Sequence, residues 1–224
     1  FDRAIPSLES LEIVSQALNE LTELTTVILT PGNHDSAERL CFLSPYVSGN
    51  LHLRTCLADI SRPVEIGSQS ETVRVWGLPY LNPDMVRTSL YDGYPDTEIT
   101  ANQKTEAEAA EIPRLPRSHT AVIAAAMRKI AKAQRALTTP ARTIIMAHAF
   151  AVGAAPSDSE RDITVGTVPA DTLDVFECYG MNHQAENQIL PAPDYLALGQ
   201  LHVQQKIKTK PSRGANNGWT IDFP

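Results

Sequence analysis

The sequence predicts an α/β fold in which helices flank central β-sheets, and three observations lead to that class. Apolar residues recur at helical spacing between residues 7 and 24, and residues 119–137 are alanine-rich with basic residues towards the end, as in helices. Short apolar runs at 26–30, 141–147 and 195–198 contain little alternation, which is typical of buried strands. Each of these strands leads into a polar cluster, as in α/β sheets that carry their function at the carboxyl ends of the strands.

The amino-terminal part of the chain is predicted to contain two helices and several short strands. Ser7 is suited to cap the first helix, which runs to Leu24, because its hydroxyl can accept a hydrogen bond from a free backbone N–H. The buried strand at 26–30 follows, and Ser36 to Leu43 is predicted to form the next helix. Short extended segments are expected between residues 51 and 81.

The later part of the chain is predicted to alternate between regular elements and polar excursions. Residues 91–118 are rich in Pro, Asp, Glu and Thr and are expected at the surface. Residues 177–193 form another polar stretch, and residues 210–224, rich in Gly, Asn, Ser and Pro, show no convincing packing pattern.

Composition places the chain among soluble globular domains. Of its 224 residues, 42% are hydrophobic and 20% are charged, and no apolar run approaches the roughly 18 residues that a membrane span requires. No charged-then-apolar leader opens the chain, so the sequence gives no sign of a signal peptide or anchor. Its cysteines, Cys41, Cys56 and Cys178, are odd in number and widely spaced, which predicts a reduced, cytoplasmic protein.

The formal net charge of −7 argues mildly against a protein that binds nucleic acid through its own surface. The basic residues between 128 and 135 recur at helical spacing, which favours a solvated helix face over a track for DNA. Bound divalent metal ions would nevertheless supply positive potential where a phosphate must lie. Charge therefore does not exclude a DNA substrate.

Three apolar strands each end in a cluster that contains a histidine. The clusters are Gly32-Asn33-His34-Asp35, then His148, then Gly199-Gln200-Leu201-His202. Because strand ends of one polarity gather along one edge of a sheet, these side chains could converge, and imidazole with amide oxygen suits manganese, iron or zinc. A single strand-terminal histidine is more often structural, and Asn-His-Asp after Pro-Gly could be only a turn. Three such histidines together favour a metal site.

These motifs resemble those of the calcineurin-like metallophosphoesterases. Residues 32–35 match the GNHD block of that family, His148 matches its lone histidine after a buried strand, and residues 199–202 resemble its GHxH block with the first histidine replaced. Residues 1–6 resemble the end of its GDxxD block, and 159–166 are similar to the SbcD-type nuclease subunits within the family. The resemblance runs from residue 1 to about residue 205, with an insertion near 177–193. It therefore implies a partial phosphoesterase domain at 1–205 and an irregular tail at 206–224 that could begin a capping or partner-binding region.

The resemblance implies a layered metallophosphoesterase fold and a role for each matching residue. Asn33 and His148 would bind one metal ion, and His202 would bind a second. His34 would contact the scissile phosphate and act as the general acid for the leaving oxygen. Asp35 is expected to be a supporting or turn-stabilising residue. The implied cofactors are two divalent ions, manganese first and magnesium second.

The activity implied by this resemblance is cleavage of DNA. SbcD-type subunits are metal-dependent double-strand 3′-5′ exonucleases and hairpin or single-strand endonucleases that serve DNA recombination, replication and repair. Their partners are an SbcC-like ATPase, DNA and a second copy of the subunit, and no membrane is involved. Two alternatives stay open: a metallophosphoesterase acting on small phosphoesters, and a degenerate domain that binds another protein.

The sequence also departs from the family pattern. Neither the DxH block nor the leading GD of the second block occurs in residues 1–224, so the fold is expected to lack its first strand. Asp2 matches only the later aspartate of the second block, for which a supporting or structural role is expected. Gln200 stands where the pattern has a metal-binding histidine, which makes it a degenerate ligand position. The chain alone is therefore expected to bind manganese weakly and to cleave DNA poorly.

Overall fold

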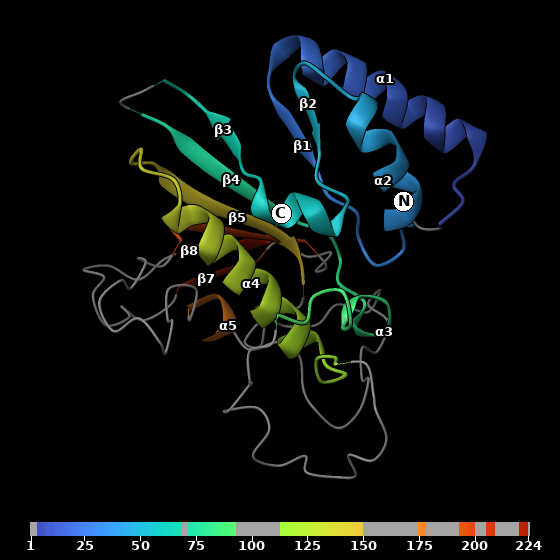
Figure 1. Ribbon diagram of the computed structural model, residues 1–224. Helices are drawn as coiled ribbons and strands as arrows, with labels where there is room; N and C mark the ends of the chain where they lie inside the picture. The colour runs from blue at the N-terminus through green and yellow to red at the C-terminus, as the bar shows by residue number, and fades with distance from the viewer. Residues whose placement is uncertain are drawn as a thin grey trace.

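The computed structural model describes residues 4–68, 71–92, 113–149, 174–177, 193–199, 205–208 and 220–223 (Figure 1). Within these residues the chain is a mixed helix-and-sheet protein with two β-sheets. The elements in order are α1 (Leu8–Leu24), β1 (Val27–Leu29), α2 (Ala37–Leu43), the 3₁₀ turn η1 (Ser44–Tyr46), β2 (Leu51–Leu53), the 3₁₀ turn η2 (Leu57–Ser61), β3 (Val64–Ile66), β4 (Val73–Leu78), α3 (Pro83–Val86), α4 (His119–Arg135), β5 (Arg142–His148), α5 (Asp174–Glu177), β6 (Tyr195–Gly199), β7 (Gln205–Lys208) and β8 (Thr220–Phe223).

The first unit joins α1 to a small parallel sheet. Ser7 caps α1 as predicted, since its side-chain oxygen accepts a hydrogen bond from the Ser10 N–H at 3.1 Å. The chain then enters β1, which pairs in parallel with β2, so that Val27 lies opposite Leu51. Helix α1 has no buried residue, and its apolar positions Leu8 and Leu24 are 79% and 82% exposed.

The second sheet has six strands in the order β3-β4-β5-β6-β8-β7. Strands β4, β5, β6 and β8 are parallel to their neighbours in this series, whereas β3 and β7 pair in antiparallel fashion at the two edges. Helix α4 lies between β4 and β5 in the chain and makes the crossover that parallel neighbours require. In this arrangement the carboxyl ends of β4, β5 and β6 lie along one edge.

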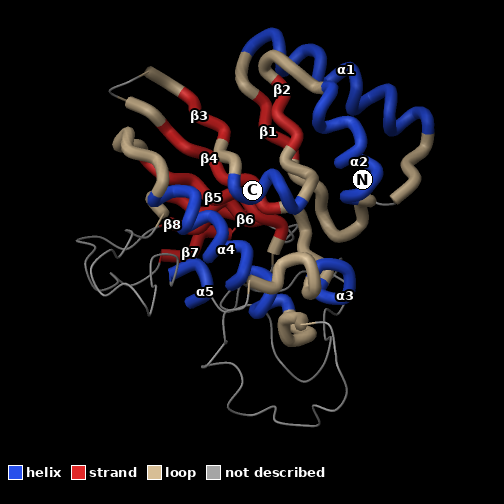
Figure 2. Tube along the Cα trace, viewed as in Figure 1, coloured by secondary structure: helices blue, strands red, loops and turns tan. Residues whose placement is uncertain are grey.

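Helix α4 covers one face of this sheet, as Figures 1 and 2 show. Strand β5 alternates in burial, with Ile145 and Ala147 buried toward the core and Ile144, Met146 and His148 only partly buried on the other face. The fully buried side chains come from both layers: Trp76, Leu78, Ile145, Leu196 and Leu198 from the strands, and Val122, Ala126, Met127 and Ile130 from α4. Each large one contributes about 1.5–3 kcal/mol of burial free energy, which fixes the sheet beneath the site.

The two sheets meet closely at Gly77 in β4. A Cβ atom at that position would lie 2.7 Å from Cβ of Arg54 and 3.1 Å from Cγ2 of Thr30, so only glycine fits. Just beyond, the Tyr80 N–H donates a hydrogen bond of 3.0 Å to the Pro31 carbonyl oxygen. The end of β1 is thereby held against the end of β4, although the two strands belong to different sheets.

Most predicted elements are confirmed, and the tail is the main correction. The predicted helices and buried strands correspond to α1, α2, α4, β1, β5 and β6, with no end displaced by more than two residues. The prediction of an irregular tail at 206–224 was wrong, because β7 and β8 both contribute to it and β8 pairs with β6. The apolar alternation in Thr220-Ile221-Asp222-Phe223 favours a strand and was obscured by the Gly and Asn residues before it.

Among the described residues, no helix has the length and apolar character needed to cross a membrane.

Candidate functional site

The predicted site residues lie where several strands end. Strand β1 leads into Pro31, strand β4 into Pro79 and Tyr80, and strand β5 ends at His148. Gly199 ends β6 directly opposite His148 in the parallel ladder. Four strand ends that are far apart in sequence therefore meet at one edge of the fold, and the strand-end argument predicted three of them, those of β1, β5 and β6.

The Gly32–Asp35 loop is a tight turn fixed by its own hydrogen bonds. The Asp35 carboxylate accepts a 2.8 Å hydrogen bond from the Gly32 N–H, and the Asp35 N–H donates to the Gly32 carbonyl oxygen at 3.2 Å. Helix α2 begins at Ala37 immediately afterwards. Asp35 therefore stabilises this loop, and the loop conformation orients the side chains of Asn33 and His34.

Asn33 and His148 are brought together across 115 positions of sequence. Nε2 of His148 lies 3.1 Å from Oδ1 of Asn33. An amide oxygen only accepts hydrogen bonds, so in this arrangement Nε2 carries a proton and donates it to Asn33. Both side chains are partly buried. This pair is the one contact between different predicted ligand positions that the described residues show.

The imidazole of His148 is enclosed by two glycines. A Cβ atom at Gly32 would lie 3.0 Å from Cε1 of His148, and a Cβ atom at Gly199 would lie 3.0 Å from its Nδ1. Either contact is tighter than ordinary van der Waals separation, so any larger residue would push the ring away from Asn33. The two glycines therefore allow the backbone of β6 and of the Gly32 turn to approach the ring from both sides.

Tyr80 completes the surroundings of His148 and was not singled out by the sequence. Its ring meets the His148 ring edge-on, with centroids 6.0 Å apart and an interplanar angle of 81°. The ring also lies 5.6 Å from that of His119, the first residue of α4. The signal that could have found Tyr80 is its position two residues after a buried strand, at the same edge as the predicted site.

The Asn33–His148 pair fits one divalent ion. Two donors bound at right angles to the same ion, at about 2.1 Å each, are about 3 Å apart. The measured separation of 3.1 Å agrees with that value, and it equally suits the hydrogen bond described above. Imidazole and amide oxygen are also donors that manganese accepts. Within the described residues, however, no three His, Cys, Asp or Glu side chains form a group that could hold a metal.

Of the other predicted site residues, the structure describes His34 and Asp35. His34 lies in the turn with a partly exposed side chain, and the described residues offer it no hydrogen bond. Asp2, Gln200 and His202 lie outside the residues that the structure describes. The structure thus brings together Asn33 and His148, positions Asp35 beside them, and leaves the second predicted metal position undescribed.

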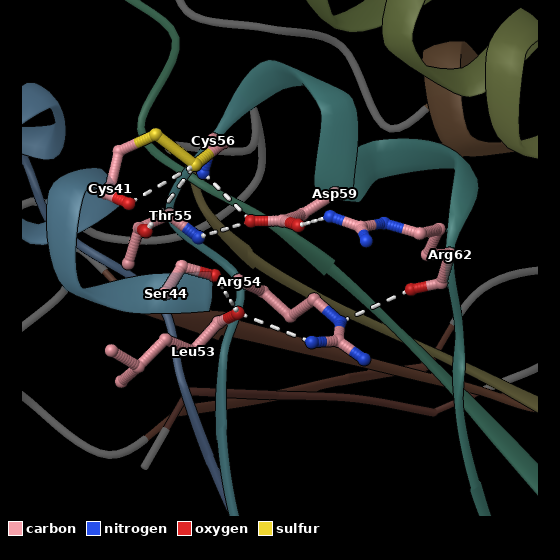
Figure 3. The surroundings of a disulfide bond; sticks show 8 residues. All are labelled: Cys41, Ser44, Leu53, Arg54, Thr55, Cys56, Asp59 and Arg62. Atoms are coloured by element: carbon pink, nitrogen blue, oxygen red, sulfur yellow. Dashed lines mark hydrogen bonds and ion pairs between the residues drawn. A yellow bond between two sulfur atoms is a disulfide. The ribbon is translucent and has the colours of Figure 1, made fainter. Parts of the chain in front are cut away.

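A disulfide lies beside this site (Figure 3). Cys41 of α2 is bonded to Cys56, which precedes η2, with their Cα atoms 5.2 Å apart. Beneath it the buried Asp59 carboxylate accepts hydrogen bonds from the Thr55 and Cys56 N–H groups at 3.1 and 2.9 Å and pairs with Arg62. The carboxylate thus satisfies the backbone where the disulfide is attached.

The disulfide corrects the sequence prediction for two cysteines. Spacing and number favoured reduced Cys41, Cys56 and Cys178, but the fold places the first two within bonding distance. Their 15-residue separation carried no signal, because proximity here depends on α2 folding back onto the chain before η2. Cys178 lies outside the described residues.

A comparison with models of known protein families finds no match to this chain.

Two partly buried histidines, His119 and His52, predict that stability falls in mild acid. Burial lowers the pKa of His119 below its usual 6.5, and burial followed by the nearby Arg54 charge lowers the pKa of His52. Because the unfolded chain takes up these protons first, the free energy of unfolding should fall as pH drops below 6.5. Urea denaturation at about pH 7.5 and about pH 5.5, above the range of most carboxylates, measures this loss.

His119→Gln should reduce that acid-induced loss, and His52→Gln should reduce it by a smaller amount because His52 is less buried. If both variants lose as much unfolding free energy between about pH 7.5 and about pH 5.5 as the unmodified chain, the two histidines do not cause the loss.

Proposed function

We propose that the chain is the nuclease subunit of a DNA-processing complex, a metal-dependent phosphodiesterase similar to the SbcD-type proteins. The observation that carries the proposal is the 3.1 Å approach of Asn33 and His148. These are the two positions to which the resemblance assigns one metal ion, and they come from different strands. The order of the GNHD turn, the lone histidine and the third strand-end cluster supports the same assignment.

The residues divide the chemistry between them. A divalent ion at this site would polarise a phosphate oxygen and activate water for in-line attack. Asn33 and His148 would hold that ion, and Asp35 would keep Asn33 in place through its bond to the Gly32 N–H. His34, adjacent to Asn33, would give its proton to the leaving oxygen. Its position in the fixed turn keeps it next to the ion-binding pair.

The acidic chain, with a net charge of −7, makes the ion central to the choice of substrate. Without a bound cation, a polyanion such as DNA would be repelled over much of the surface. We therefore propose that the metal site supplies the positive potential that attracts the phosphate. The rest of the surface would contact DNA and an SbcC-like ATPase subunit, to which cleavage would be coupled.

Manganese titration calorimetry tests the metal site. His148→Gln should lower Mn²⁺ affinity about tenfold or more, because an imidazole donor is replaced by a weaker one. Gln200→His should raise affinity, because it restores the donor that the family pattern carries there. His52→Gln, which changes a histidine in β2, is the matched control and should bind Mn²⁺ as the unmodified chain does.

Cleavage of linear double-stranded DNA in saturating Mn²⁺ completes the test. Cleavage that depends on Mn²⁺ and is lost in His148→Gln supports the nuclease. Equal Mn²⁺ affinity in all three variants would refute the metal assignment. Mn²⁺ binding without cleavage of DNA, but with hydrolysis of a small phosphodiester, would favour the small-substrate enzyme; neither activity would favour the protein-binding domain.

A further inference from the structure

A cleft opens beside the Asn33–His148 pair, between α2 and α3. Its volume is about 380 Å³, within the range of about 300–1,000 Å³ that small-molecule sites occupy. One wall is the turn and the start of α2, the floor is the disulfide with the chain before η2, and the other wall is the segment from the end of β4 to α3. Its lining includes Asn33, Asp35 and Glu38 on the first wall and Tyr80, Asn82 and Met85 on the second.

The lining suits a flat, apolar ring. Pro79, Tyr80, Met85 and Val86 supply apolar and aromatic surface from the wall between β4 and the end of α3, and Leu57 of η2 adds to it. The sulfur of Met85 and the disulfide on the floor add polarisable atoms, and thioether sulfur makes favourable contacts with aromatic rings. Such surfaces bind nucleobases by stacking and burial, and they do so with little regard to which base is bound.

The charge of the cleft excludes a phosphate from its interior. Asp35 and Glu38 bring carboxylates to its edge, and among the described residues that line it there is no Lys, Arg or His. An anion there would meet only negative charge. A neutral ring with amino groups meets acceptors instead, because carboxylates and the Asn82 side chain can accept hydrogen bonds from exocyclic amines.

Asn33 connects the cleft to the ion-binding pair. It lines the cleft and its Oδ1 lies 3.1 Å from His148, so a group held at the pair is adjacent to a group held in the cleft. We propose that this cleft binds the nucleobase of a nucleotide whose phosphate lies at the Asn33–His148 pair. The inference rests on the proposed phosphodiesterase function for the phosphate, but the base site stands on the shape and chemistry of the cleft.

Equilibrium dialysis with three probes separates the two sites. Deoxyadenosine carries only the base, deoxyribose 5-phosphate only the phosphate, and deoxyadenosine monophosphate both. In Mn²⁺, the nucleotide should bind about tenfold more tightly than deoxyribose 5-phosphate, as stacking of one base predicts. Ala37→Phe, which fills the cleft at the start of α2, should remove that advantage and leave binding of deoxyribose 5-phosphate unchanged.

Two further variants keep the test decisive. Ala17→Phe, on the exposed surface of α1, is the matched control and should retain the tenfold advantage. Met85→Ala should weaken nucleotide binding without disturbing the core, because Met85 is 64% exposed. Its effect supports the assignment if Ala37→Phe alters the fold, as judged by the urea midpoint.

The outcomes distinguish the base site from the proposed function. If deoxyribose 5-phosphate binds as tightly as the nucleotide, the base site is overturned and the phosphodiesterase proposal stands. If deoxyadenosine binds, is displaced by Ala37→Phe, and deoxyribose 5-phosphate does not bind in Mn²⁺, the base site stands and the phosphate assignment falls. Binding of the nucleotide that is equal in all variants would overturn the base site.

Discussion

Replacing His34 by alanine should lower the rate of DNA cleavage by about 10²- to 10⁴-fold, the usual contribution of a positioned general acid. The expected loss comes from the leaving oxygen, which would depart without a proton. Mn²⁺ affinity should not change, because the proposal places the ion on Asn33 and His148, which contact each other at 3.1 Å, and not on His34. The rate is measured on linear double-stranded DNA in saturating Mn²⁺, and the affinity by calorimetry on the same preparation.

The pH dependence of that rate separates an acid from a structural residue. A general acid gives a rate that falls as pH rises above its pKa, and His34→Ala should remove this limb as well as lowering the rate. A leaving group that needs no proton, such as p-nitrophenolate, should partly restore cleavage in the variant. If His34→Ala instead lowers Mn²⁺ affinity and rate together, His34 belongs to the metal site and the acid assignment is wrong.

Removing the disulfide should lower the free energy of unfolding by about 3 kcal/mol, the value expected for a closed loop of about 15 residues. The double variant Cys41→Ser, Cys56→Ser opens the loop, which spans a sequence separation of 15. The loop contains η1 and β2, so its release also frees the strand that pairs with β1. Urea denaturation of the oxidised chain and of the variant measures the difference.

Reduction provides an independent measurement of the same bond. A dithiol reductant should bring the unmodified chain to the stability of the double variant and leave the double variant unchanged. Cys178→Ser is the matched control and should show the full effect of the reductant. A difference of less than about 1 kcal/mol between oxidised chain and double variant would mean that the cross-link adds little to the packing of α2.

The pairing of Asn33 with His148 could be foreseen because both follow apolar strands. Local patterns identify a buried strand, and parallel strands bring their carboxyl ends to one edge whatever the distance between them in sequence. Strands β1 and β5 follow this rule, and Asn33, which comes after β1, lies next to His148 at the end of β5. Helix α4 could also be predicted from the sequence, because its Ser118 cap and its alanine-rich pattern are local features.

Other parts of the site depend on contacts that local patterns do not encode. The pairing of Cys41 with Cys56 depends on how α2 packs on the chain before η2, and the cleft depends on the separation of α2 from α3. Tyr80 belongs to the site because Gly77 allows the two sheets to approach each other. A single glycine in a strand does not predict such an approach. The apolar spacing of α1 predicts a helix with one apolar face, but such spacing does not say which surface, if any, covers that face, and α1 has no buried residue.

The position of β8 between β6 and β7 has a consequence for synthesis. Strands β3 to β6 can pair as soon as they leave the ribosome, but β7 has no neighbour in this sheet until β8 exists. At about 5–20 residues per second, the 15 residues from Lys208 to Phe223 take roughly one to three seconds. During that interval the edge of β6 is unpaired and can capture another nascent chain. Dense polysomes should therefore yield less folded protein than sparse ones.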